Sequence, residues 1–448
     1  MESRSEDRPA EAPRHCVLGA ALALMALTSA CATYGSAALT WDGASLLFGF
    51  LDTQSVSLPH HRFSVALFQV PALWASKLTS NVRVVELVYC ALYTSVPCVS
   101  AWASWLAVRA TRPRLVVFPL TWLCCGAVAG QLFFVTEALL AVNLAWPLLL
   151  VVVTGFSVGR LTWSALGVLL LFGLHPVSGP LLVLVAVSAV VCATAEQARR
   201  RELHAAASVL GALGAARIVM AFRDVYERSQ ADVQLADVWQ SLHLPRAAVM
   251  AVTALPALVL TMQLAQRKAR TLTFGLLLVA LVVVLTALLP WAANVQAWRD
   301  ELNFRFIAPL AALPFFVAAL IALRVGRPSA ALGLDDQLVC LGGALVFVSV
   351  LSVQTRLWFG LRQRLESTLA SSESRCVSMN DTPEAALTAL RWWTTPSYAL
   401  LIQGRAPRSL LLAGDDCSRE DHAEMIPVNP WYQRQRDTGW FDLRRTGL

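Results

Sequence analysis

Charged residues are scarce in this chain of 448 residues. Only 15% of its residues are Asp, Glu, Lys or Arg, whereas 57% are hydrophobic. A soluble domain is roughly a quarter charged, so this chain lacks the polar surface that water alone would require. The composition therefore excludes an ordinary soluble protein and indicates a membrane protein.

The sequence also lacks the motifs that mark many soluble enzymes. It contains no P-loop, no dinucleotide fingerprint, no Cys/His zinc spacing and no repeat of fixed period. The formal net charge of +7 resides largely in Arg clusters between apolar runs, which is topology information rather than a nucleic-acid footprint. We therefore expect the lipid bilayer, and not a nucleic acid, as the primary partner.

Apolar runs near 20 residues recur from end to end, and this length crosses a hydrocarbon core of about 30 Å. They predict an all-α polytopic bundle with about eleven transmembrane helices. The expected spans are 16–38, 82–107, 114–133, 138–155, 161–174, 178–195, 204–222, 246–265, 272–291, 305–323 and 337–354.

Arginine clusters occupy alternate connections between these spans, as the positive-inside rule describes. They lie at 109–114, 160, 199–201, 267–270 and 324–327. This pattern predicts a cytoplasmic tail at 1–15, a transmembrane domain at 16–355 and an extracytoplasmic region at 356–448. A cleavable signal peptide ending near Ala30–Ala32 is the alternative for the first apolar run.

The C-terminal region has the pattern of a small α+β unit. An amphipathic helix is expected at 356–374, a second helix at 384–393, and strand-like segments at 397–403 and 409–412. Cys376 and Cys417 are the only two of the ten cysteines in this region. Because we expect an oxidising compartment there, a disulfide between them is one possibility and two free thiols the other.

Ionisable residues near membrane depth are the informative ones, since placing charge there is costly. Asp42 follows directly on the first span, and it opens a loop at 39–81 with two expected interfacial helices at 44–51 and 63–78. Further candidates on the expected outer side are His61 and Arg62 in this loop, Glu137 and His175 in tight turns, and Arg299 and Arg305 before the tenth span.

A first span that ends at an acidic residue, followed by a long outer loop with interfacial helices, resembles the GT-C superfamily of membrane glycosyltransferases. Glu137 in the second outer loop, an Arg at the outer edge of a late span and an outer C-terminal region are similar as well. The resemblance covers the whole chain as architecture. It departs from some GT-C families in that Gly43, not a second acidic residue, follows Asp42.

The resemblance implies transfer of a sugar from a polyprenyl-phosphate donor to a glycan, lipid or protein acceptor on the extracytoplasmic face. It implies Asp42 and Glu137 as catalytic carboxylates, with Asp42 as the general base. The expected substrate-binding residues are Arg62, His61, His175, Arg299 and Arg305, with the Arg side chains on the lipid phosphate. We assign no metal ligands, and a requirement for a divalent cation stays open.

Each candidate also has a purely structural interpretation. Asp42 is equally suited to cap the helix that follows it, and Glu137 and His175 are equally suited to ordinary turns. His60 and His61 are adjacent and would point about 100° apart on a helix, which disfavours a metal pair. The acidic stretch from Asp224 to Asp237 is interpreted as a solvated loop.

Two other classes of function compete with the glycosyltransferase. A transporter or flippase would keep ionisable groups at the membrane midplane and often shows repeated halves. A non-catalytic membrane scaffold would direct Asp42 and Glu137 into bulk water. Charges gather at one surface, and the centres of the expected spans carry almost none, apart from Arg217 and Glu86 toward span ends. Together with the lack of a repeat, this distribution disfavours a transporter.

The expected location is a bacterial inner membrane, with the N-terminus cytoplasmic and the C-terminus extracytoplasmic. Of the asparagines in expected outer segments, Asn81, Asn294, Asn303 and Asn429 do not begin an Asn-x-Ser/Thr acceptor, which favours a bacterium. Asn380-Asp381-Thr382 does match that pattern.

Overall fold

The computed structural model describes residues 16–40, 42–56, 58, 60, 62–130, 136–155, 158–229, 312–323, 331–378, 394–412, 417 and 440–443. The expected spans 246–265 and 272–291 lie outside these residues, as do His61, Arg299 and Arg305. Within the described part, the chain is mostly helical and carries one small sheet.

The helices keep their bounds close to the apolar runs of the sequence. They are α1 (Cys16–Tyr34), α2 (Gly43–Thr53), α3 (Ala66–Leu78), α4 (Val82–Thr94), α5 (Val96–Val108), α6 (Val117–Gly130), α7 (Glu137–Thr154), α8 (Val158–Phe172), α9 (Ser178–Ala195), α10 (Arg200–Arg223), α15 (Leu334–Ser371) and α16 (Thr395–Gln403). Short 3-10 turns stand at η1 (Ala37–Leu39), η3 (Phe63–Val65), η4 (Pro113–Val116) and η5 (Gln197–Arg199).

Six helical segments of the described part are long and apolar enough to cross a membrane. They are Cys16–Tyr34, Val82–Val108, Glu137–Thr154, Ser178–Ala195, Gln197–Arg223 and Leu334–Ser371. Each coincides with a span expected from the sequence. Shorter apolar helices occupy parts of the expected spans at 114–133, 161–174 and 305–323. The structure thus shows a helical membrane protein with six candidate spans, while the total of eleven is not confirmed.

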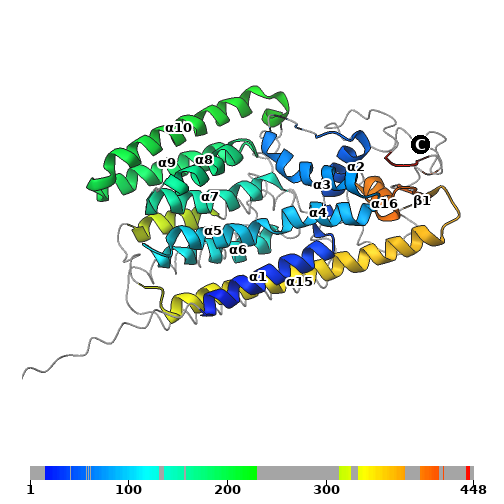
Figure 1. Ribbon diagram of the computed structural model, residues 1–448, viewed down its shortest axis with the longest axis horizontal. Helices are drawn as coiled ribbons and strands as arrows, with labels where there is room; N and C mark the ends of the chain where they lie inside the picture. Colours follow the sequence, from blue (N-terminus) through cyan, green and yellow to red (C-terminus); the bar gives the residue numbers. More distant parts are fainter. Residues whose placement is uncertain are drawn as a thin grey trace, which may run out of the picture.

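The helices form layers that run side by side along the long axis of the molecule (Figure 1). α1 packs against α15 at one edge, and α9 packs against α10 at the other. Glycines permit the second contact: a Cβ added at Gly214 would lie 2.9 Å from the carbonyl oxygen of Gly179. Such small residues allow close helix approach where no hydrophobic effect drives association in lipid.

Charged pairs gather at the two ends of the bundle. One end, here called the Arg199 end, joins Arg112 to Glu196 and Arg199 to Glu196 and Glu202. The opposite end, called the Arg62 end, is where α1 and α10 finish and α7 and α9 begin. Of the arginines that the sequence analysis assigns to one membrane face, Arg112 and Arg199 therefore lie together at this one end of the bundle.

The segment between α1 and α4 forms two helices, as expected, but they differ in burial. α2 is buried along nearly its whole length, because it is covered by α3 and α16. It therefore does not have the exposed face of a helix lying in the headgroup plane. α3 does: Leu67, Trp74 and Leu78 are exposed, while Gln69 and Ala72 are buried.

α15 runs without interruption through residue 355, where the sequence analysis begins the C-terminal region. Its 38 residues correspond to about 57 Å at 1.5 Å per residue, about twice the thickness of a hydrocarbon core. This one continuous helix is therefore long enough to cross a membrane and to continue beyond it. This replaces the expected span plus separate amphipathic helix.

The C-terminal region contains a two-stranded parallel sheet of β1 (Cys376–Ser378) and β2 (Leu410–Leu412). The expected strand at 397–403 is instead the helix α16, because Pro396 suits a first helical turn and Gly404, at φ +87°, ends it. A disulfide joins Cys376 to Cys417. The ring of Phe441 stacks on Phe48 at 4.9 Å, so the C-terminal region packs on the α1–α4 segment.

Candidate functional site

Arg62 joins three segments that are far apart in the sequence. It precedes η3, and its guanidinium lies 3.4 Å from Glu137 at the first position of α7. Its Nε and Nη2 donate to one oxygen of Glu227, beyond α10, at 3.0 and 2.7 Å. The side chain of Arg62 is 11% exposed and that of Glu227 only 5%. The structure thus brings together two residues that the sequence proposed, Arg62 and Glu137, and adds a third.

The two carboxylates hold Arg62 in its charged form. Burial acts to lower the pKa of Arg62, but Glu137 and Glu227 raise it by more, so its pKa lies above the ordinary value. The charged guanidinium of Arg62 is attracted to the carboxylate of Glu137. Glu137 therefore holds Arg62 in place through this ion pair.

His60 and Asp224 form a second pair next to this network. His60 Nδ1 lies 3.0 and 3.2 Å from the two carboxylate oxygens of Asp224. The ring of Tyr226 stacks on His60 at 4.4 Å. His60 has a φ of +50°, a left-handed conformation that is uncommon for residues other than glycine. The backbone at His60 is thus held in the conformation that aims its ring at Asp224.

The backbone that follows Asp224 also holds its carboxylate in place. The N–H groups of Tyr226 and Glu227 donate to its Oδ1 at 3.0 and 3.1 Å. Burial raises the pKa of Asp224, but these N–H groups and His60 lower it by more, and the net pKa is below the ordinary value. Asp224 is therefore a preorganised carboxylate, whereas the sequence analysis placed it in a solvated loop. The Asp-x-x-Glu spacing of Asp224 and Glu227 is similar to a helix-capping pattern, and this feature of the sequence could have indicated that backbone N–H groups hold Asp224.

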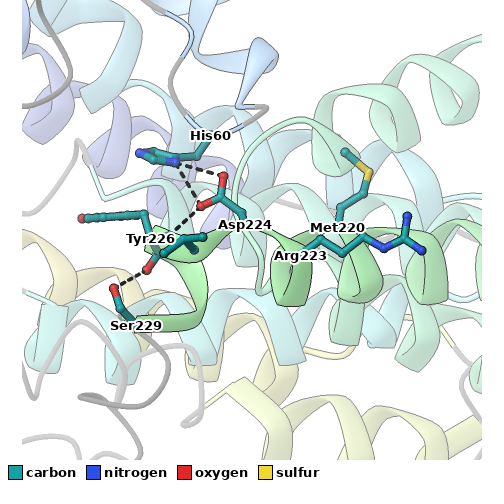
Figure 2. A pocket seen from close by; sticks show the side chains of 7 residues that line it. His60, Met220, Arg223, Asp224, Tyr226 and Ser229 are labelled. Atoms are coloured by element: carbon teal, nitrogen blue, oxygen red, sulfur yellow. Dashed lines mark hydrogen bonds and ion pairs between the residues drawn. The ribbon is translucent and has the colours of Figure 1, made fainter.

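A hollow of about 880 Å³ lies beside this pair. It is lined by His60, Met220, Arg223, Asp224, Val225, Tyr226 and Ser229. In Figure 2 the ring of His60 and the carboxylate of Asp224 point toward each other, whereas Arg223 extends away along α10. A space of this size accommodates a sugar or a lipid headgroup.

A second ionic network lies at the same end of the bundle but among helix bodies. Glu86 of α4 accepts hydrogen bonds from Ser36, Arg83 and Arg362 on one carboxylate oxygen. Arg362 of α15 also donates to Ser36 at 2.6 Å. This network ties α4 to α15 and joins both to the end of α1 through Tyr34 and Ser36. The sequence had marked Glu86 only as a charge toward the end of a span.

The remaining candidates occupy different settings. Asp42 stands at the start of α2, partly exposed, and its side chain makes no capping bond to that helix. Helix capping, the structural alternative for Asp42, is thus not what the geometry shows. His175 Nδ1 accepts from the N–H of Val177 at 3.2 Å, as a turn residue would. Among the described residues, no cluster of three or more His, Cys, Asp or Glu side chains is arranged to hold a metal ion.

The fold and these sites define a polytopic α-helical membrane protein with two ionic networks at one end. Comparison of the chain with protein-family models, with curated proteins and with solved structures finds no match. The geometry of the Arg62 end is therefore the basis for assigning a function.

Proposed function

We propose that this protein is a membrane glycosyltransferase that moves a sugar from a polyprenyl-phosphate donor to an acceptor on the extracytoplasmic face. The observation that carries the proposal is the pairing of Arg62, just before η3, with Glu137, at the start of α7. His60, two residues before Arg62, lines a hollow together with Asp224. Placing several buried charges together is costly, and such clusters are concentrated at functional sites.

The disulfide supports an extracytoplasmic position for this end. Disulfides persist in oxidising compartments, and Cys376–Cys417 belongs to the region that packs on the α1–α4 segment through Phe48 and Phe441. The arginine-rich Arg199 end then faces the cytoplasm, in agreement with the positive-inside rule. On this proposal the N-terminus is cytoplasmic, in a bacterial inner membrane.

The reaction needs a proton acceptor and a group that stabilises the departing phosphate. The acceptor hydroxyl oxygen attacks the anomeric carbon, the bond from that carbon to the phosphate oxygen breaks, and polyprenyl phosphate leaves. The hydroxyl proton passes to Asp42, which we retain as the base because it is the acid that follows the first span, where the resemblance to GT-C enzymes expects it. Glu137 positions the site through Arg62.

A transfer assay with the purified protein in detergent tests this proposal. Undecaprenyl-phosphate-linked glucose, mannose and arabinose are offered with glycan, lipid and peptide acceptors, and released undecaprenyl phosphate is measured. We expect Asp42→Asn to reduce the rate at least about a hundredfold, as removal of a general base does. The matched control is Glu373→Gln, an exposed acid just beyond α15, which should keep full activity.

Two outcomes would reject parts of this proposal. Full activity of Asp42→Asn would remove Asp42 as the base while leaving the enzyme class intact. Uptake or flipping of the labelled lipid in vesicles, with no bond cleavage for any donor, would instead favour a transporter.

A further inference from the structure

Arg217 of α10 is a buried guanidinium with unused hydrogen-bond donors. It is 1% exposed, and among the residues that the structure describes its Nε and Nη2 have no hydrogen-bond partner. A buried polar group without a partner is costly, and a buried charge is more so. Such a group in a folded protein points to a partner that binds there.

The two unused donors indicate the chemical class of that partner. Nε and Nη2 form one edge of the guanidinium fork, and this edge pairs with two oxygens of a carboxylate or phosphate. The same edge of Arg62 is occupied by Glu227, and its remaining nitrogen faces Glu137. Of these two arginines, Arg217 is thus the one whose Nε–Nη2 edge has no acceptor among the described residues.

The depth of Arg217 suits a lipid phosphate. It lies six residues before the end of α10 at Arg223, which is about 9 Å along the helix axis. That places the guanidinium near the boundary between the headgroups and the hydrocarbon core. Glu227, Arg62 and Asp224 are its electrostatic neighbours, so Arg217 adjoins the Arg62 network.

Hydroxyl groups on neighbouring element ends have unused hydrogen-bonding capacity too. Ser178 begins α9, Thr136 precedes α7 and Ser64 lies in η3. All three are buried, and within the described part of the chain none of their hydroxyl oxygens has a hydrogen-bond partner. Contact between Gly179 and Ile218 sets the start of α9 level with Arg217 on α10.

We propose that Arg217 binds the phosphate group of a lipid, taking two of its oxygens on the Nε–Nη2 edge. This inference rests on the proposed function, because it names the residue that holds the donor phosphate there. It replaces Arg62 in that role, since the fork of Arg62 is already occupied by protein carboxylates. The hydroxyls of Ser178, Thr136 and Ser64 are the nearby groups able to donate to the remaining phosphate oxygens.

Binding measurements on the full chain in detergent test this role without a transfer assay. The probes are undecaprenyl phosphate, undecaprenol, which lacks the phosphate, and inorganic phosphate. We expect undecaprenyl phosphate to bind the wild type, and Arg217→Gln and Arg217→Lys to bind it at least about tenfold more weakly, because each loses the bidentate pair. Arg201→Gln, an exposed arginine at the opposite end of the same helix, should bind as the wild type does.

The probes separate the two sources of phosphate. Arg217-dependent binding of undecaprenyl phosphate, with inorganic phosphate failing to compete, supports a lipid phosphate. Arg217-dependent binding of inorganic phosphate alone would overturn the lipid assignment in favour of a free oxyanion. Transfer activity that is absent while Arg217-dependent lipid binding persists would reject the proposed function and not this inference.

The main structural alternative is that Arg217 only balances the surplus negative charge of Glu137 and Glu227 around Arg62. In that case Arg217→Gln lowers thermal stability but binds undecaprenyl phosphate as tightly as the wild type, which overturns the proposal. If Arg217→Gln does not fold, the binding of undecaprenyl phosphate and undecaprenol to the wild type still tests whether a phosphate site exists. Equal thermal stabilisation by undecaprenyl phosphate and undecaprenol would show that no phosphate site exists.

Discussion

The two ionic networks at the Arg62 end are built from similar residues but differ in where those residues stand. Glu86, Arg83 and Arg362 project from helix bodies, and the Glu86 side chain is 1% exposed. Arg62, Glu137 and Glu227 stand at loop and helix ends, with a hollow beside the adjoining His60–Asp224 pair. The first arrangement fastens three helices together. The second holds charge where a ligand can reach it.

This comparison teaches that burial alone does not mark a site in a membrane protein. Glu86 is the more deeply buried acid, yet its charge is directed at Arg83, Arg362 and Ser36 of the protein itself. At the other network, Arg217 keeps a buried edge without a partner among the described residues. Glu86 Oε2 also lacks a hydrogen-bond partner among the described residues, so the networks differ in the kind of group that is unused: one acceptor oxygen at Glu86, and two adjacent donors on one cation at Arg217.

Replacing Glu86 by Gln is expected to have the largest effect on stability. The change leaves the guanidinium groups of Arg83 and Arg362 without their shared carboxylate. Removing one partner of a buried ion pair costs about 3–5 kcal/mol. We expect the thermal unfolding temperature in detergent to fall clearly, whatever the effect on transfer. Glu373→Gln serves as the control for loss of one acid, and an unfolding temperature equal to that of the wild type in Glu86→Gln would show that this network does not fasten the helices.

A double-mutant cycle on Arg62 and Glu227 is expected to have the next largest effect. The two charges are bonded through two N–H groups and are little exposed, so solvent screens them weakly. Hydrogen bonds to charged groups contribute about 1.5–3 kcal/mol, and the cycle of Arg62→Gln with Glu227→Gln should return a coupling in this range. The matched cycle with Glu137→Gln should give less, since that contact is longer at 3.4 Å. Equal coupling in both cycles would contradict the geometry described for Arg62.

Run length and residue type were sufficient to predict the spans that are described. Each of the six candidate spans coincides with an expected one because an apolar run near 20 residues has few stable alternatives in a bilayer. The strand expected at 397–403 was wrong, because apolar runs of this length fit a buried helix equally well. The disulfide between Cys376 and Cys417 was one of two possibilities, and the structure contains it.

The sites were harder to predict than the spans, because tertiary contacts decide which charges meet. Arg62 and Glu137 were expected in one site, and the structure brings them together. Asp224 and Glu227 were assigned to a solvated loop, since nothing in their local sequence reveals that His60 and Arg62, 164 and 165 residues away, approach them. Arg217 was visible as a charge near a span end, but its unused edge depends on packing that no local pattern encodes.

The smallest expected effect concerns acid pH and tests whether Asp224 belongs to the preorganised network. Its folded-state pKa is lowered by the N–H groups of Glu227 and Tyr226 and by His60, against the opposing effect of burial. A carboxyl with a lowered folded pKa stabilises the fold above its unfolded pKa of about 3.9 and loses that contribution as the pH falls through the folded value. The unfolding temperature of Asp224→Asn should therefore fall less between about pH 6 and pH 3 than that of the wild type does.

His60→Gln is expected to lie between Asp224→Asn and the wild type, because it removes one of the groups that lower the pKa of Asp224 and leaves the two backbone N–H groups. Thermal unfolding of the three proteins across this pH range measures the effect. If the unfolding temperature of Asp224→Asn falls with acid as steeply as that of the wild type, the interactions of Asp224 with His60 and the two backbone N–H groups do not contribute to the stability of the fold. The Arg62 end would then consist of the ion pairs of Arg62 alone, and the contrast with the Glu86 network would rest on Arg217.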